Sequence, residues 1–329
     1  MTILIKYTFK KLLVFSPVID FVLAIVSVPI AVILWVFTRI SPSRLPLTTK
    51  TFKKLGVFPI RDHYYQPLFN HSLLQRPLNQ DRNLPGVNLN VAGQLGLLEN
   101  LTFAPELNSL NLENRDRSVD LRFDFVIDNG WFERGDAEFL YQVIRKFKPK
   151  KVVEIGSGQS TKIARLALAK NEKESNAVSD HICIEPYEQP WLEELGIKII
   201  RKPVEDCPKS IFSELQDGDL LFIDSSHIIR PQGDVLFEYL EILPELSTGV
   251  IVHIHDIFTP KDYPADWIVN KVLFWNEQYL LEMLLSNSQR YEIMAGLNFL
   301  KNNHFDKLAK VCPYLQPESS PASFYFRIV

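Results

Sequence analysis

Acidic residues and histidines follow two apolar, β-rich runs in the second half of the chain. The run LLFIDSSH ends in Asp224 and His227, and the run VIVHIHD ends in His255 and Asp256. In an open α/β sheet, ligands bind beyond the carboxyl ends of the strands, so we expect these side chains to converge there. A histidine beside carboxylates is suited to remove a proton from a hydroxyl group. The sequence therefore predicts His227 and Asp224 as catalytic residues.

The same residues are candidate ligands of a divalent ion. Oxygen donors favour Mg²⁺ or Mn²⁺ over zinc, which makes Asp224, His255 and Asp256 the candidate metal ligands. Because side chains alternate along a strand, His253 shares a face with His255. We expect His253 to be a hydrogen-bonded core residue. The alternative interpretation is that these residues form a site that needs no metal ion.

A glycine turn within residues 151–162, KVVEIGSGQSTK, follows a third apolar run. Gly156 and Gly158 lie between this strand and a helix that begins near Ser160. Backbone N–H groups and a helix N-terminus at this place suit a nucleotide-like ligand. The third glycine of a dinucleotide fingerprint would fall at Thr161 and is missing, which favours a ligand other than NAD.

Glu185 ends the next run, CIEP, where a carboxylate can accept hydrogen bonds from ribose hydroxyls. Gly156 and Glu185 lie 29 positions apart, more than the roughly 20 of a dinucleotide site. A polar insert at residues 171–180 accounts for the excess. The alternative is a solvated residue at the end of a strand.

From residue 131 onward, strand and helix patterns alternate. The expected strands are residues 151–155, 181–185, 197–200, 220–224, 250–255, 291–295 and 323–328. The expected helices are residues 136–146, 160–170, 190–195, 234–246 and 267–285. This order predicts an α/β fold: a Rossmann-like, doubly wound, mostly parallel seven-stranded sheet with helices on both faces. The last two strands lack an evident long helix between them, which leaves an antiparallel pairing open.

The N-terminal part carries an apolar run at residues 12–37 whose single charge is Asp20. Its 26 residues exceed the roughly 20 that cross a bilayer. Trp35 and flanking basic residues suit an interface. The following sequence, FTRI, offers no small-residue cleavage site, which favours an uncleaved anchor over a signal peptide. Pro29 leaves a kinked, re-entrant or surface-lying helix open, and a buried core helix is a further alternative.

Charge is divided unevenly along the chain. Residues 1–54 sum to +7 and the remainder to −10, for a total of −3. The larger basic cluster follows the apolar run, which predicts a cytoplasmic catalytic domain. The acidic remainder argues against nucleic acid as a partner. The three cysteines form no disulfide framework or zinc spacing, as is typical of a reducing compartment.

We expect three regions: a membrane anchor with basic flanks at residues 1–45, a linker and capping region at 46–127, and a catalytic domain at 128–329. Residues 61–65, RDHYY, could line a substrate entrance. A polar surface patch is the alternative interpretation.

With these residues together, residues 128–329 resemble the class I S-adenosylmethionine-dependent methyltransferases. The first motif of that class is similar to EIGSGQS at residues 154–160, with Ser160 where many members have a third glycine. The resemblance implies that residues 154–158 cradle the methionine portion, that Glu185 holds the ribose, and that residues 204–206 border the adenine. The implied cofactor-binding residues are Glu154, Gly156, Ser157, Gly158, Ser160, Glu185 and Glu205.

Within the class, DSSH at 224–227 and His255-Asp256 look like the O-methyltransferase branch of catechol-type and metal-dependent sugar enzymes. There, an aspartate after the fourth strand and an acid after the fifth hold Mg²⁺. His227 is similar to the general base of the sugar enzymes, and His255 stands where a related enzyme has a carboxylate. The chain also looks like membrane-attached bacterial proteins of this class.

The sequence thus predicts O-methylation of a membrane-associated, sugar-like or envelope-precursor acceptor, either a small molecule or lipid-linked, with His227 as base. A metal-dependent hydroxylase or hydrolase on the same fold is one alternative. A catalytically inert, membrane-tethered binding module is another. A dehydrogenase fits least, because the third glycine and the acid spacing are missing.

Overall fold

The computed structural model describes residues 16–40, 44–60, 67–113, 120–176, 178–187 and 189–329. The chain divides into two compact units, residues 1–75 and 76–329. The predicted cluster at 61–65 and the first four residues of the predicted apolar run lie outside the described residues.

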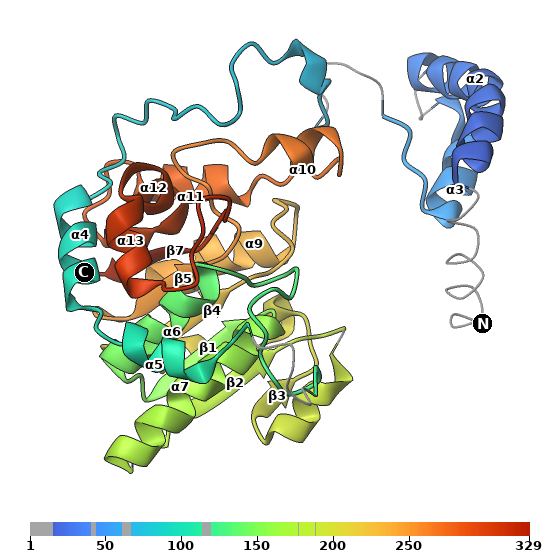
Figure 1. Ribbon diagram of the computed structural model, residues 1–329. Helices are drawn as coiled ribbons and strands as arrows, with labels where there is room; N and C mark the ends of the chain where they lie inside the picture. Colours follow the sequence, from blue (N-terminus) through green and yellow to red (C-terminus); the bar gives the residue numbers. More distant parts are fainter. Residues whose placement is uncertain (1–15, 41–43, 61–66, 114–119, 177, 188) are drawn as a thin grey trace. The chain divides into compact units, whose positions relative to one another are not determined.

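The first unit contains two longer helices (Figure 1). Helix α2, Ser16–Ile40, continues through Pro29. Its Pro17–Ile40 portion has a mean hydropathy of 2.6 and is 6% buried, and it is the one helix of the described residues long and apolar enough to cross a membrane. Helix α3, Pro46–Leu55, ends at Gly56 in the left-handed region. A short 3-10 turn, η3, spans His71–Leu73.

The second unit is built on one seven-stranded sheet with the order β3-β2-β1-β4-β5-β7-β6. Its strands β1 to β5 pair in parallel, and β7 pairs antiparallel with both β5 and β6. The predicted fold class is therefore confirmed, and the antiparallel pairing falls on the last strand. The strands are β1 Lys151–Ile155, β2 Asp180–Ile184, β3 Lys198–Ile200, β4 Leu220–Ile223, β5 Ile251–Ile254, β6 Tyr291–Gly296 and β7 Phe324–Ile328.

Both faces of the sheet are covered by helices, because its central strands are buried on both sides and apolar at most positions. Val152 and Phe222 belong to the core cluster of one face, whereas Val153 and Ile223 belong to that of the other. Helices α6 and α7 lie on the first face (Figure 1). The elements around the sheet are α4 Val91–Asn100, α5 Ala104–Leu110, α6 Asp136–Phe147, α7 Gln159–Ser175, η4 Pro190–Leu195, η5 Val204–Asp206, α8 Ser210–Ser213, α9 Asp234–Phe237, η6 Glu238–Ile242, η7 Leu243–Glu245, α10 Ala265–Val269, α11 Glu277–Leu285, α12 Leu297–Asn303 and α13 Phe305–Val311.

The prediction of one helix over residues 267–285 is wrong. Helix α10 ends at Val269 and α11 begins at Glu277. Between them the backbone N–H of Leu273 donates to the Trp267 carbonyl at 2.8 Å, and Val272 has a φ of 57°. The left-handed backbone at Val272 interrupts the helix. Apolar periodicity depends on residue type alone, so it did not indicate this interruption.

Helices α4 and α5 pack on the sheet through the core cluster that also contains α6 and α13. Arg145 of α6 fixes α5 in place. Its guanidinium donates to Glu106 of α5 at 2.8 Å and to Glu174 of α7 at 2.8 Å. The Arg145 side chain is 1% exposed. The segment before the catalytic fold is thus held by a buried cation.

We expect Arg145→Met to lower the free energy of unfolding by about 2–4 kcal/mol, because it leaves two carboxylates without their shared partner. Arg122→Met is the matched control. The Arg122–Asp120 pair is exposed and screened by solvent, so its loss should leave the free energy of unfolding nearly unchanged. Urea denaturation followed by circular dichroism measures both values. Equal effects would contradict the role given to Arg145.

Candidate functional site

The glycine turn after β1 brings three strand ends together. Gly156 has a φ of 78°, and its N–H donates to the Ile184 carbonyl of β2 at 3.0 Å. A Cβ atom at Gly156 would overlap the carbonyl oxygen of Asp224, just after β4. Only glycine combines this backbone conformation with so close an approach.

Thr161 stands where a dinucleotide fingerprint has its third glycine. Its hydroxyl donates to the Glu154 carboxylate at 2.6 Å and accepts the N–H of Gly158 at 3.1 Å. The Cys183 thiol also donates to Glu154, at 3.3 Å. Glu154 is 1% exposed and lies beneath the turn, outside the cavities that the other candidate residues line. Glu154 therefore stabilises the turn through its hydrogen bond with Thr161.

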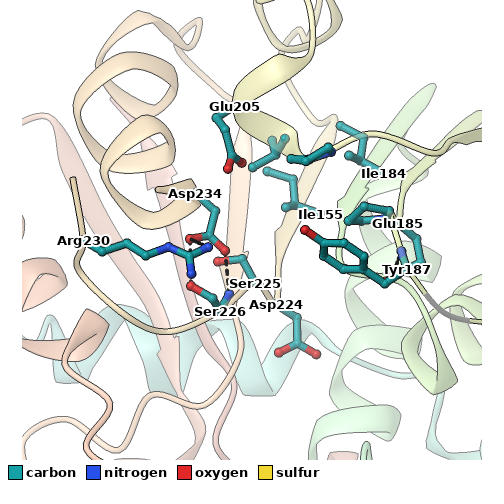
Figure 2. Close-up of a pocket in the computed structure, with 14 residues that line it drawn as sticks. Ile155, Ile184, Glu185, Tyr187, Glu205, Asp224, Ser225, Ser226, Arg230 and Asp234 are labelled. Atoms are coloured by element: carbon teal, nitrogen blue, oxygen red, sulfur yellow. Dashed lines mark hydrogen bonds and ion pairs between the residues drawn. The ribbon is translucent and has the colours of Figure 1, made fainter. Parts of the chain in front are cut away.

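A cavity of about 250 Å³ opens beyond the ends of β1 and β2. Figure 2 shows Glu185 and Tyr187 on one side of it and Ser225 and Asp234 on the other. The Glu185 carboxylate accepts the N–H groups of Ser157 at 3.2 Å and Tyr187 at 3.1 Å. Apolar side chains complete the lining and suit a flat ring; they include Ile155, Ile184, Pro203 and Val204. Glu205 borders this cavity as well, so both predicted acids lie along it.

A second cavity, of about 410 Å³, joins the glycine turn to the acid–histidine cluster. Its lining includes Gly156, Ser157, Gly158, Ser160, Glu185, Asp224, His227, His255 and Asp256. The structure therefore brings together along one continuous lining the predicted cofactor and catalytic residues other than Glu154 and Glu205.

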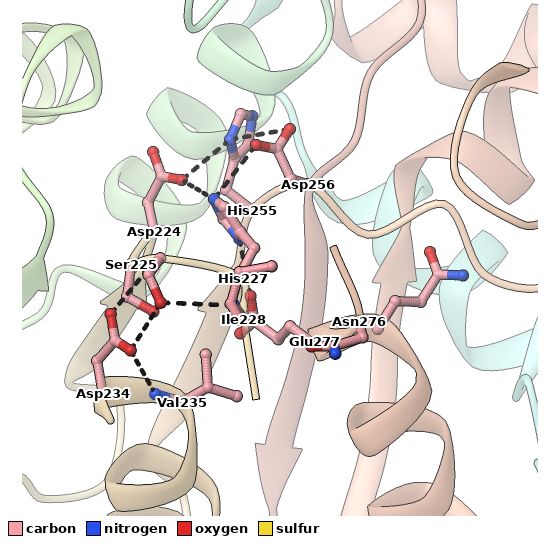
Figure 3. Close-up of polar contacts among 12 residues, drawn as sticks. Asp224, Ser225, His227, Ile228, Asp234, Val235, His255, Asp256, Asn276 and Glu277 are labelled. Carbon is pink, nitrogen blue, oxygen red and sulfur yellow. Dashed lines mark hydrogen bonds and ion pairs between the residues drawn. The ribbon is translucent and has the colours of Figure 1, made fainter. Parts of the chain in front are cut away.

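The four residues singled out after β4 and β5 converge, as expected from the sheet edge (Figure 3). The Nε2 atom of His227 lies 3.3 Å from Asp224 Oδ1 and 3.5 Å from Asp256 Oδ2. The Nδ1 atom of His255 lies 3.6 Å from Asp224 and 3.5 Å from Asp256. His227 and Asp256 have φ values of 60° and 59°. Such strained backbones are concentrated at functional sites.

Glu277 holds His227 and was not identified from the sequence. Its Oε2 lies 2.8 Å from His227 Nδ1, and its Oε1 accepts the Tyr239 hydroxyl at 3.0 Å. The backbone N–H groups of Asn276 and Glu277 also donate to the His227 carbonyl. Glu277 is fully buried, and an acid in an apolar helix was the signal that could have indicated it.

Asp136 plays a comparable part beside His255. Its carboxylate lies 3.6 Å from His255 Nε2 and accepts the N–H groups of Ala322 and Ser323. The sequence indicated Asp136 only as the start of a helix. Its proximity to His255, the residue after β5, could be seen only in the folded structure.

Opposite charges dominate the ionisation of the cluster. Burial alone would raise the pKa of Asp224, but the charge of the nearby His255 and a hydrogen bond from His227 hold it well below its usual range. Burial alone would lower the pKa of His227, but its bonds to Asp224 and Glu277 raise it well above the usual value. Desolvation raises the pKa of Asp256. The cluster thus favours a cation among its carboxylates.

The donor set also fits a divalent ion. Ligand atoms of Asp224, His227 and Asp256 lie within 4.8 Å of one another. His255, a predicted ligand, lies beside this group, and neither of its ring nitrogens has a hydrogen-bond partner within the described part of the chain. Two carboxylates at adjoining strand ends would supply the oxygen ligands that Mg²⁺ prefers.

A third cavity, of about 540 Å³, meets the second at Trp131, His255 and Asp256. It borders the acid–histidine cluster through His255 and Asp256. Its further lining includes Asp128, Glu133, Arg134, Asp136, Trp267, Lys271, Gln316, Glu318 and Ser319.

The chain is similar to several known proteins. Residues 153–257 match the family model described as a methyltransferase domain. An uncharacterized protein of Archaeoglobus fulgidus is 30% identical over 180 residues, which cover 49% of this chain and 75% of that protein. An O-methyltransferase from Bacillus cereus, solved in complex with SAH, has 13% identity and a TM-score of 0.34, covering 71% of this chain and 90% of its own. A putative O-methyltransferase from Klebsiella pneumoniae has 14% identity and a TM-score of 0.34, covering 72% and 96%.

The sheet order, the glycine turn and the family match together define a methyltransferase fold. Residues 153–257 carry a methyltransferase domain, and with the sheet order this confirms the class I S-adenosylmethionine-dependent methyltransferase fold that the sequence resemblance predicted. S-adenosylmethionine is the cofactor of this class.

Proposed function

We propose that this methyltransferase acts on a hydroxyl group, with His227 as the general base. The observation that carries the proposal is the orientation of the imidazole. Its Nδ1 atom is held by Glu277 at 2.8 Å, and its Nε2 atom lies between Asp224 and Asp256 at the wall of the second cavity.

The hydrogen bond to Glu277 fixes the tautomer. With Nδ1–H donating to a buried carboxylate, Nε2 faces the cavity and accepts the proton of the acceptor hydroxyl once it has lost its own, a loss that the raised pKa of His227 places at alkaline pH. The Trp275 ring lies 4.2 Å from the imidazole and restricts its movement. S-adenosylmethionine supplies the methyl group as an electrophilic sulfonium. The residues of the two cavities would contribute mainly by aligning the nucleophile with it.

A divalent ion, if bound, would be held by Asp224 and Asp256 and would lower the pKa of a bound hydroxyl. We expect Asp256→Asn to require more Mg²⁺ for half-maximal rate and to lower the rate by about a hundredfold. Asparagine tolerates the left-handed backbone of Asp256, so the fold should persist. Rates are measured against added Mg²⁺ after treatment with EDTA. Full activity of the EDTA-treated wild type would contradict a metal.

The third cavity supports an uncharged acceptor. Its cations are already paired, Arg134 with Asp128 at 2.8 Å and Lys271 with Asp266 at 3.5 Å. Carboxylates outnumber cations along the lining. Trp131 is 81% exposed and offers a flat apolar face. Aromatic faces beside carboxylates and amides suit a neutral ring that carries hydroxyls, whereas a phosphate would be repelled.

Membrane attachment through α2 is part of the proposal. The helix is long and apolar enough, and the basic residues that follow it favour a cytoplasmic catalytic unit. An acceptor at the membrane surface, such as a lipid-linked sugar, would then be within reach.

Transfer of a labelled methyl group tests the proposed reaction. The full chain is incubated with methyl-labelled S-adenosylmethionine and three probe acceptors: a neutral sugar, a sugar phosphate and an amine. We expect alkali-stable label, as a methyl ether, on the neutral sugar. Label on the amine alone, or an alkali-labile ester, would contradict O-methylation of a hydroxyl.

A further inference from the structure

Helix α3, with the sequence PLTTKTFKKL, is a basic segment with little packing of its own. In α3, all of which the structure describes, no side chain is buried. Lys50, Lys53 and Lys54 are exposed. The sequence contains no acidic residue between Asp20 and Asp62. The helix therefore presents positive charge that no neighbouring acid in the sequence neutralises.

The two kinds of side chain lie on different sides of α3. At about 100° per residue, Lys50, Lys53 and Lys54 fall on one side of the helix and Phe52 and Leu55 on the other, with Leu47 at the boundary beside Lys54. Leu47 is 81% exposed and Leu55 71%. Exposed apolar residues continue beyond the helix, at Val57, Phe58 and Ile60. A helix with this division and such exposed apolar groups suits the plane of a membrane surface.

Contacts within the first unit place α3 at one end of α2. The rings of Phe37 and Phe52 meet edge to face, with centroids 4.9 Å apart. Near that end of α2, the Arg39 guanidinium lies over the Trp35 ring, 4.6 Å from its centroid. Tryptophan and arginine side chains at the end of an apolar span favour the headgroup level. Helix α3 thus returns to the level where lipid headgroups would lie.

We infer that α3 is an interfacial helix that binds anionic phospholipids. Lys50, Lys53 and Lys54 pair with the headgroups, while Leu47 and Leu55 enter the acyl boundary. The inference rests on the membrane attachment through α2 proposed above. Each lysine near an anionic surface favours binding by about fivefold, so the three together favour it by about a hundredfold. A zwitterionic surface would attract the apolar side alone, and charge complementarity therefore selects anionic lipid.

The test uses the full chain reconstituted into vesicles of phosphatidylcholine, alone or mixed with phosphatidylglycerol. Leu55→Cys carries a polarity-sensitive fluorophore at an exposed site, since the native cysteines are buried. We expect a blue-shifted emission in the anionic vesicles and a smaller shift in the zwitterionic ones. Raised ionic strength should remove the difference in emission between the two kinds of vesicle, because salt screens the lysine charges.

Reversal of the three charges, Lys50→Glu with Lys53→Glu and Lys54→Glu, should abolish the anionic shift. The matched control is Lys301→Glu with Lys307→Glu and Lys310→Glu, which changes the same number of charges in the second unit. Vesicle flotation separates the two claims. A chain that does not float overturns both the anchor and this inference. A chain that floats, with emission indifferent to lipid charge or to the α3 lysines, overturns this inference alone and favours a protein or zwitterionic lipid on α3.

Discussion

Replacement of His227 by alanine is expected to lower the rate of methyl transfer by about 10²–10⁴-fold. The affinity for S-adenosylmethionine should stay nearly unchanged, because Glu185 and the glycine turn line the cofactor cavities independently of the imidazole. The physical reason is the loss of Nε2, the atom placed to take the proton. Single-turnover rates and calorimetric affinities measure the two effects separately.

Glu277→Gln extends the same test to the residue that positions the imidazole. The amide still reaches His227 Nδ1 but no longer carries the charge that stabilises the imidazolium, so the rate should fall by less than in the alanine variant. His304→Ala, in the loop between α12 and α13, serves as the control and should leave the rate unchanged. An unaltered rate in His227→Ala would reject His227 as the base.

Replacement of Gly156 by alanine is expected to destabilise the fold and abolish cofactor binding. A non-glycine residue at a φ of 78° costs about 1–2 kcal/mol. The added methyl would also overlap the Asp224 carbonyl, a backbone atom that can move only with β4. That movement would displace Asp224 from both cofactor cavities, so thermal unfolding and cofactor titration should both register the change.

Gly158→Ala is the matched control for stability. The backbone there is extended, and nothing lies within 4 Å of an added Cβ. Its melting temperature should match that of the wild type. Equal destabilisation by the two substitutions would show that the close approach at Gly156 is not the cause.

Much of the second unit follows from the sequence, since its strands are short apolar runs bounded by turns. Residues 151–155 were predicted as a strand and form β1, because a strand buried on both faces is apolar at almost every position. The convergence of Asp224 and His227 with Asp256 was predicted because the carboxyl ends of parallel strands lie at the same edge of the sheet. The sequence also indicated Glu185 and Glu205, which line the first cavity.

What the sequence did not show depends on contacts between distant segments. His227 and Glu277 are 50 positions apart, and their pairing requires the break between α10 and α11. Asp136 reaches His255 only because α6 packs against the sheet. Glu154 has the residue type of a cofactor ligand, but Thr161 and Cys183 bind its carboxylate beneath the turn. Residue type and spacing do not reveal such partners.

Calorimetric titration of the full chain with S-adenosylmethionine tests the central claim most directly. The account predicts saturable binding of one cofactor per chain. In Glu185→Ala, loss of a charged hydrogen-bonding partner should weaken that binding by about 10–100-fold. Absence of binding to a chain shown by circular dichroism to be folded would contradict the account.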